Sequence, residues 1–446
     1  MSAAHGRSEG ALSPPGGPAQ GAGGHNTRAH RKVLAVAYGG GHIAMLLPVL
    51  RALRQRDAEL HIDLLALTTA ARAARDAGEA PLGYADLLHL LDDAERARAL
   101  ELGSAAMDGH AHPDVGADET RAYLGVNRLD LEWQYGADGA QARYAQHGRH
   151  GFHPIGFMRR VVDALRPDLV LTTNSPRSEE AVVDAARDAG VPSVAVLDLF
   201  GLPGDRFAAR TRHPDRVCVL APQVRDNLVA SGWPRDIIAV TGNPAFDTLL
   251  DPTWAQRAAV LRAALGWQRR KVVLLATQPE MRAHPDVPWP AGDALPLAME
   301  QALRDWVDAR DDVALIVRHH PNHGHRLPSR ASTPNVHVSR GADEPIELLI
   351  RAADAVVVQA TTVGLQAAVA GVAVLALRCS PAVRHGIDYA ALGAACSVAD
   401  LDALPAALAA VLGAPHEPGP WALQAAAADA VAQQVFELLE SRRGTS

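Results

Sequence analysis

Short continuous apolar runs alternate with longer stretches rich in alanine and arginine over most of this chain of 446 residues. Apolar runs without a regular polar alternation are typical of strands that are buried on both faces of a sheet. Six such strands are predicted in the first half, at 32–38, 61–67, 167–173, 192–200, 215–221 and 237–242. Five more are predicted in the second half, at 271–277, 313–320, 335–340, 355–360 and 372–378.

Helical patterns separate these strands. They lie at 70–103, 178–190, 295–309, 344–352, 362–370 and 401–441. Strands separated by helices indicate βαβ units and a parallel sheet that is covered on both faces. The pattern therefore predicts an α/β fold with two Rossmann-like domains, at 31–251 and 252–418, and an interdomain cleft as the ligand site. The polar segment 104–155 has weak periodicity and receives no assignment.

Composition narrows the class of protein. Residues 1–30 are rich in Gly, Ala, Ser and Pro, which predicts a disordered tail. The net charge of −7 gives no sign of a nucleic-acid binder. The chain has only three cysteines, widely spaced, which favours a reducing cytoplasm over a disulfide framework or a zinc site. No apolar run reaches the roughly 18–20 residues that a bilayer span needs.

The first predicted strand ends in the sequence GGGH, residues Gly39, Gly40, Gly41 and His42. Glycine allows close approach of a ligand to the backbone, and the N-terminus of a following helix favours an anion such as phosphate. The sequence fits neither the dinucleotide-binding nor the P-loop pattern. Because Pro48 is unfavourable inside a helix, the helix is predicted to start near Leu47. A tight turn without a ligand is the alternative.

A second turn of this kind follows the strand 355–360. Thr361 or Thr362 can cap the next helix, which would leave the backbone N–H groups of Val363 and Gly364 for an anion. An ordinary capped helix packed by alanines explains the same residues equally well.

Two further loops carry polar groups. After the strand 313–320, Arg318 and His320 are suited to a phosphate or a sugar hydroxyl. Four histidines of this loop suggest a metal, namely His319, His320, His323 and His325. They lack a carboxylate or cysteine at zinc spacing, and no metal is predicted. In the sequence TGNPAFD, Gly242 and Asn243 form either a ligand contact or a linking turn.

The order of GGGH, TGNPAFD, RHHPN and TTVGLQAAVAG resembles the GT-B-fold nucleotide-sugar enzymes. This order of motifs is similar to that of three groups of these enzymes: the peptidoglycan N-acetylglucosaminyltransferase, the non-hydrolysing UDP-N-acetylglucosamine 2-epimerases, and capsule-type polysaccharide transferases. The resemblance covers roughly residues 32–440. It implies that the second domain binds the nucleotide and that the last helix, within 419–446, crosses back to the first domain.

The resemblance also implies roles for particular residues. The turn Thr361–Gly364 would meet the diphosphate of the donor. The family usually presents a glutamate to the ribose, five residues before the glycine that ends the helix; this chain has Gln366 there. The epimerases have an Arg-Pro-Glu opening after the first strand, a later His-x-Glu-Ala-Gly segment and paired glutamates. This chain lacks them, and Ala367 and Ala368 occupy the glutamate positions.

The resemblance implies a glycosyltransferase that moves a sugar from a nucleotide diphosphate to an acceptor in cell-surface polysaccharide or glycoconjugate synthesis. His42 is predicted as the base, with Asp198 or a histidine of 104–155 as alternatives. The partners are a nucleotide-sugar donor and an unidentified acceptor; a lipid-linked acceptor would imply peripheral contact with the inner membrane. No cofactor is expected. An epimerase-like enzyme and a catalytically silent nucleotide-sugar binder remain alternatives.

Overall fold

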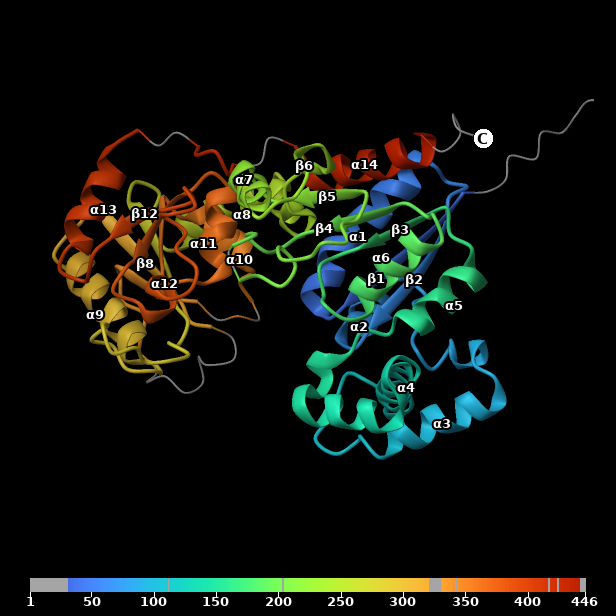
Figure 1. Cartoon of the computed structure of the whole chain (residues 1–446). Helices are drawn as coiled ribbons and strands as arrows, with labels where there is room; N and C mark the ends of the chain where they lie inside the picture. Colours follow the sequence, from blue (N-terminus) through green and yellow to red (C-terminus); the bar gives the residue numbers. More distant parts are fainter. Residues whose placement is uncertain are drawn as a thin grey trace, which may run out of the picture. The chain divides into compact units, whose positions relative to one another are not determined.

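The computed structural model describes residues 31–441 except 111, 203, 321–329, 340, 342, 416–417 and 423–424. The tail predicted for residues 1–30 lies outside the described residues. Two six-stranded sheets form the framework, and all strand pairs within each sheet are parallel (Figure 1).

The first sheet has the strand order β2-β1-β3-β4-β5-β6. Its strands are β1 (Lys32–Tyr38), β2 (His61–Leu67), β3 (Leu169–Thr172), β4 (Ser193–Val196), β5 (Arg216–Val219) and β6 (Ile238–Val240). Successive side chains of β1 enter different cores. Val33 and Ala35 belong to one apolar cluster, whereas Leu34 and Val36 belong to another on the opposite face. Burial on both faces explains the continuous apolar runs in the sequence.

Helices cover both faces of this sheet. The helices of the first half are α1 (Gly40–Arg56), α2 (Thr69–Asp76), α3 (Asp93–Ser104), α4 (Ala117–His147), α5 (Ile155–Leu165), α6 (Ser178–Asp188) and α7 (Pro222–Ala230). The cluster around Val33 contains buried residues of α1 and α2, and the cluster around Leu34 contains residues of α3, α4, α5 and α6.

The helix α1 begins at Gly40, so the prediction of a start near Leu47 is wrong, and Pro48 lies inside the helix. An internal proline costs about 3 kcal/mol through a lost hydrogen bond and a steric clash. Seven buried side chains of α1, among them Leu46 and Leu50, pack on the sheet and offset this cost.

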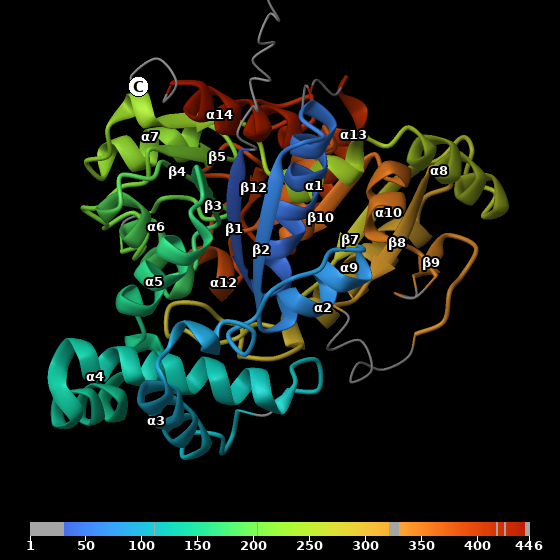
Figure 2. The same cartoon turned by 90° about the vertical axis from the view of Figure 1, so that its right-hand side faces the viewer.

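The segment without a sequence assignment folds mainly as α4, which packs against α3 (Figure 2). The two helices approach closely at glycines. A Cβ atom on Gly125 would lie 1.9 Å from the carbonyl oxygen of Ala99, and one on Gly103 would lie 2.1 Å from that of Arg121. Small residues therefore permit this crossing. Gly136, with φ of 71°, interrupts the helical conformation of α4.

The second sheet has the strand order β12-β11-β10-β7-β8-β9. Its strands are β7 (Lys271–Ala276), β8 (Val313–Arg318), β9 (Val336–Val338), β10 (Ala355–Val358), β11 (Ala373–Leu377) and β12 (Cys396–Val398). Its helices are α8 (Thr253–Ala264), α9 (Ala294–Asp308), α10 (Ile346–Ala352), α11 (Thr362–Val369), α12 (Pro381–Arg384) and α13 (Leu404–Gly413). Pro252, the predicted domain boundary, lies in the connection between β6 and β7.

The last helix, α14 (Ala427–Ser441), packs against the first sheet, as the fold prediction requires. Val431 and Val435 belong to the same apolar cluster as Leu50 of α1, and Figures 1 and 2 both show α14 beside α1. The carboxylate of Asp247 accepts hydrogen bonds from the backbone N–H groups of Ala427 and Ala428, both at 2.8 Å. Asp247 thus binds the first N–H groups of the helix, which have no partner within it.

Candidate functional site

The first candidate site lies at the carboxyl ends of β1, β3 and β4, which are neighbours in the first sheet. His42 is in the first turn of α1, Glu179 is in the first turn of α6, and Asp198 follows β4. The Nδ1 atom of His42 lies 3.1 Å from Oε1 of Glu179 and 2.7 Å from the hydroxyl oxygen of Thr173. The Nε2 atom lies 3.9 Å from Oδ2 of Asp198. The structure therefore brings both predicted catalytic residues together.

Glu179 was not identified from the sequence, although it determines the geometry of this site. Its side chain is fully buried, and it accepts hydrogen bonds from the backbone N–H groups of Tyr38 at 2.6 Å and Ser175 at 2.8 Å. Its other contacts are the hydroxyl of Thr173, at 2.5 Å, and the ring of His42. The two N–H groups and the hydroxyl of Thr173 donate to the carboxylate. The Glu179 carboxylate is thus held in one orientation by its donors.

Glu179 also sets the protonation pattern of His42. A carboxylate only accepts hydrogen bonds, so Nδ1 of His42 carries the proton that faces Glu179, and Nε2 is left to accept one. Burial by itself lowers the pKa of His42, but the hydrogen bond and charge of Glu179 and the charge of Asp198 outweigh burial and the opposing charge of Arg177. The pKa of His42 is therefore raised above its ordinary value of 6.5.

The three glycines before His42 have different surroundings. Gly39 has φ of 90°, a conformation that side chains rarely adopt, and it makes the turn from β1 into α1. The N–H group of Gly40 donates to the hydroxyl of Thr69 at 3.0 Å, so it is already bound within the protein. Gly40 and Gly41 are exposed. The turn itself explains Gly39, and an anion remains a prediction for Gly41 and His42.

The second candidate site is a cavity of about 470 Å³ at the carboxyl ends of β7, β8 and β10. Polar groups from three segments line it, together with four apolar residues. The polar residues are Thr277, Gln278, Arg318, His319, His320, Thr361, Thr362 and Gln366, and the apolar ones are Ala276, Ile346, Ala360 and Val363. The structure thus brings Arg318, His320 and the turn at Thr361 into one cavity, as the sequence predicted. Openings at the carboxyl ends of parallel strands are the usual ligand sites of such sheets.

The cap of α11 corrects part of the prediction. Thr361 is the N-cap, and its hydroxyl accepts a hydrogen bond from the N–H group of Val363 at 3.4 Å. The N–H group of Gly364 donates to the carbonyl oxygen of Thr361 at 3.0 Å. The prediction that Val363 and Gly364 offer unpaired donors is therefore wrong, because Thr361 binds both. The N–H group of Thr362 is the remaining donor of this turn that the helix itself does not use.

Gly364 is buried beneath the cavity rather than in its lining. A Cβ atom on Gly364 would lie 2.8 Å from Cγ2 of Val358 and 3.2 Å from the ring of Tyr389. This glycine lets α11 pack closely on β10. Gly364 therefore has a packing role instead of the predicted direct contact with a diphosphate.

Arg318 and His319, which line the cavity, have hydrogen-bond partners within the protein. The guanidinium of Arg318 donates to the hydroxyl of Ser339 at 3.0 Å and to the carbonyl oxygen of Glu344 at 3.1 Å. Burial lowers the pKa of Arg318, and the charge of Glu344 opposes this change. His319 lies between the hydroxyl of Thr277, at 3.1 Å, and the carboxylate of Glu300, at 3.2 Å. His323 and His325 lie outside the described residues.

Two remaining predicted residues have local structural partners. Gly242, with φ of 86°, follows β6, and Asn243 is buried. The side-chain oxygen of Asn243 accepts a hydrogen bond from the N–H group of Ala245 at 2.9 Å, which caps a short helix. This contact favours the linking turn over a ligand contact. Gln366, by contrast, lines the cavity with a half-buried side chain.

Comparison with solved structures assigns the fold. The chain is similar to a candidate UDP-N-acetylglucosamine 2-epimerase from Listeria monocytogenes, with a TM-score of 0.56 and 16% identity over 94% of this chain and 98% of that one. The UDP-N-acetylglucosamine 2-epimerase from Methanocaldococcus jannaschii gives a TM-score of 0.55 and 13% identity over 91% and 99%. The enzyme from Neisseria meningitidis, solved with UDP-N-acetylglucosamine bound, gives 0.54 and 13% over 92% and 100%. The chain has the GT-B fold.

The GT-B fold is assigned from likeness in structure, not in sequence. No protein-family model matches the sequence, and the comparison with curated proteins also finds no match. The likeness extends over more than nine-tenths of this chain and of each of these three structures.

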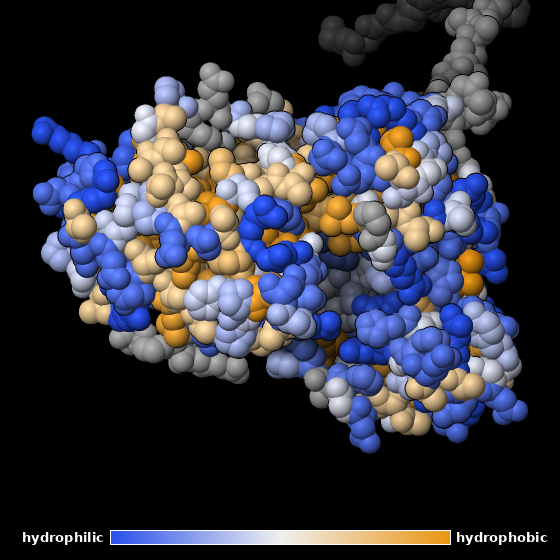
Figure 3. All heavy atoms as spheres, turned by 60° about the vertical axis from the view of Figure 1, so that its left-hand side comes forward, coloured by the Kyte–Doolittle hydropathy of each residue, from blue (hydrophilic) through white to orange (hydrophobic). Residues whose placement is uncertain are grey.

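The surface of this GT-B chain is mixed in character. On the face drawn in Figure 3, hydrophilic residues are interspersed among hydrophobic ones. Among the described residues, no helix combines the length and the apolar character that crossing a membrane requires.

Proposed function

We propose that this chain transfers a sugar from a nucleotide diphosphate donor to the hydroxyl group of an acceptor, with His42 as the general base. The observation that carries the proposal is the His42–Glu179 pair. Glu179 holds the proton of His42 on Nδ1, so Nε2 faces Asp198 and can accept a proton. A buried carboxylate that orients a histidine in this way is a recurring arrangement in enzymes that activate hydroxyl groups.

In the proposed step one proton is transferred, one bond to the anomeric carbon forms, and one bond to it breaks. The acceptor hydroxyl gives its proton to Nε2 of His42 while its oxygen bonds to the anomeric carbon of the donor sugar. The bond from that carbon to the diphosphate breaks, and the nucleotide diphosphate leaves with the electron pair. Arg318, His320 and the N–H group of Thr362 would stabilise the negative charge that develops on the diphosphate.

Epimerisation at C2 of the same kind of donor is the second candidate, and the likeness to three UDP-N-acetylglucosamine 2-epimerases supports it. The local residues favour transfer. The chain has Gly40, Gly41 and His42 after its first strand instead of Arg-Pro-Glu, and two alanines of α11, Ala367 and Ala368, at the positions of the paired glutamates. Both alanines are buried, and their methyl side chains have no titratable group that could act as an acid or base.

Thermal unfolding with a panel of nucleotide sugars tests donor binding. UDP-N-acetylglucosamine, UDP-glucose, GDP-mannose, dTDP-glucose and CDP-linked donors are suitable probes. A ligand that binds the native state raises the melting temperature by mass action. Gln366→Glu should strengthen binding several-fold, because a carboxylate makes a stronger hydrogen bond to a ribose hydroxyl, and Gln366→Ala should weaken it. Stabilisation by none of these donors would contradict the proposal.

The reaction is then followed by NMR in deuterated water with the donor that binds. Transfer, with water or an added sugar as acceptor, releases the nucleotide diphosphate and leaves the C2 proton in place. Epimerisation exchanges that proton for deuterium and forms a second sugar nucleotide. Exchange at C2 would replace the transfer proposal with the second candidate, and binding without either reaction would indicate a silent binder.

A further inference from the structure

Three side chains that commonly bind metals converge outside the two candidate sites. His284 and Asp286 lie in the loop between β7 and α9, and His385 directly follows α12. The Oδ1 atom of Asp286 accepts a hydrogen bond from Nδ1 of His284 and another from Nε2 of His385 at 2.7 Å. The three ligand atoms all lie within 4.8 Å of one another. The two imidazole rings are stacked, with centroids 3.3 Å apart.

A buried carboxylate fixes the two segments that carry this cluster. Glu280, on the same loop as His284, accepts hydrogen bonds from the hydroxyl of Ser380 at 2.6 Å and the N–H group of Ala382 at 3.0 Å. It also accepts one from the side chain of Gln359 at 2.6 Å. The loop is therefore held against the start of α12 independently of the histidines. Ligands on segments that are already fixed lose little freedom when they bind an ion.

We propose that His284, Asp286 and His385 bind a divalent transition-metal ion such as Zn²⁺, which fastens the loop 277–293 to α12. Two imidazoles and one carboxylate suit Zn²⁺, Co²⁺ or Ni²⁺, whereas Mg²⁺ and Ca²⁺ prefer oxygen ligands alone. Zn²⁺ lies about 2.0–2.2 Å from nitrogen and oxygen ligands, so small side-chain rotations would bring the three atoms around one ion. The proposal concerns structure and is independent of the proposed reaction.

The surroundings leave the site open to an ion from solution. The side chains of His284 and Asp286 are 44% exposed, and that of His385 is 33% exposed. The Nε atom of Arg384 lies 3.3 Å from Oδ2 of Asp286, so it contacts the oxygen that the two histidines do not use. The sequence gives no sign of this cluster, because His385 is about 100 residues away from the other two side chains. Only the folded chain brings them together.

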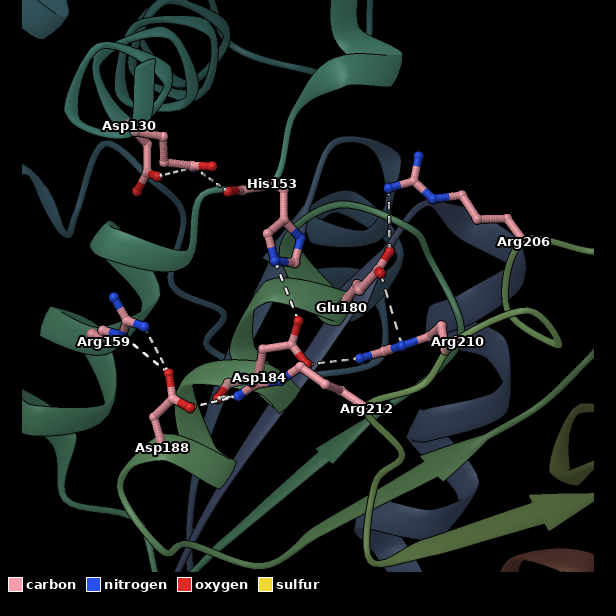
Figure 4. A network of polar contacts seen from close by, with 10 residues as sticks. Asp130, His153, Arg159, Glu180, Asp184, Asp188, Arg206, Arg210 and Arg212 are labelled. Carbon is pink, nitrogen blue, oxygen red and sulfur yellow. Dashed lines mark hydrogen bonds and ion pairs between the residues drawn. The ribbon is translucent and has the colours of Figure 1, made fainter. Parts of the chain in front are cut away.

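A second group of histidine and acids provides a contrast. His153 lies 3.3 Å from Oδ2 of Asp184, and Glu180 is close by. Figure 4 shows that arginines occupy these carboxylates: Arg210 and Arg212 contact Asp184 at 3.0 and 3.2 Å. Burial alone would raise the pKa of Asp184, but His153 and the two arginines lower it. A cation at this group would have to displace fixed arginines, so it is a matched control.

Titration of Zn²⁺ into the full-length, metal-free protein by calorimetry tests the proposal, and the absorption spectrum of bound Co²⁺ reports the ligand geometry. We expect binding at one site that includes two nitrogen ligands. Because even the loss of a supporting residue around a metal costs 10–100-fold in affinity, His284→Asn and His385→Asn should each weaken binding at least about tenfold. His153→Asn should leave the affinity unchanged. Zn²⁺ should raise the melting temperature of the unaltered protein but not that of His385→Asn.

The exposed positions of the two histidines make loss of folding in these variants unexpected, and circular dichroism checks it directly. The proposal is overturned if Zn²⁺ does not bind, or if both variants bind it as tightly as the unaltered chain, since other histidines would then hold the ion. Loss of binding in His153→Asn alone would assign the metal to the group shown in Figure 4 and would also overturn the proposal.

Discussion

The two ring nitrogens of His42 have different surroundings, and this difference determines what the residue can do. The Nδ1 atom faces Glu179 and Thr173, which are buried, whereas Nε2 faces the partly exposed carboxylate of Asp198. Both carboxylates raise the pKa of His42 against the effect of burial. A base accepts a proton only in its neutral form, so the rate should rise as the pH increases through this raised pKa.

Asp198→Asn separates His42 from Asp198, two of the groups that the sequence proposes as the base. If His42 is the base, removal of the neighbouring charge lowers its pKa, and the rising part of the pH–rate profile moves to lower pH while the rate at high pH is largely kept. If Asp198 is the base, turnover should fall by about two to four orders of magnitude at every pH. The measurement is the pH dependence of kcat and of kcat/KM.

At the scale of elements, the sequence predicts strands that are buried on both faces and residues that lie just after the end of a strand. Strands such as β1, which is apolar and buried from Val33 to Ala37, and β10 form continuous apolar runs because helices cover both faces of the sheets. The strand β12 was missed because it has three residues, of which Cys396 and Ser397 are exposed. The sequence predicts His42 as a site residue because it lies just after a strand. Glu179 acts through a contact across 137 residues, which periodicity cannot reveal.

The packing of α11 on β10 gives a prediction for Gly364. Gly364→Ala places a methyl group 2.8 Å from Cγ2 of Val358 and against the ring of Tyr389. Overpacking of this kind costs about 1–3 kcal/mol of the free energy of unfolding. Gly413→Ala, where nothing lies within 4 Å of the added atom, is the control and should be neutral or slightly stabilising. Chemical denaturation measures both, and equal effects would contradict the packing role.

At the scale of the whole molecule, α14 joins the end of the chain to its first sheet. Its residues Val431, Val435 and Leu439 are buried in the cluster that contains α1, and Asp247 binds its first N–H groups. One apolar cluster also contains residues of both sheets, such as Val217 and Val356. Stability is therefore expected to be shared along the chain rather than confined to one end.

Deletion of residues from 425 onward should lower the stability of the entire first sheet. The deletion exposes Leu50 and Val49 of α1 together with their neighbours, and the loss of several large buried side chains costs several kcal/mol. Hydrogen exchange should show faster exchange in β1 and β3 as well as in α1. Faster exchange in the last residues alone, with an unchanged melting temperature, would show that α14 does not contribute to the stability of the first sheet.

The central claim is that His42 is the base of a reaction on a nucleotide diphosphate sugar bound by this GT-B chain. Release of the nucleotide diphosphate from the stabilising donor, with water as the acceptor, tests it most directly when the unaltered chain is compared with His42→Gln. The account predicts that turnover falls by about two to four orders of magnitude while the dissociation constant of the donor stays within about twofold. Equal turnover in the two proteins would contradict it.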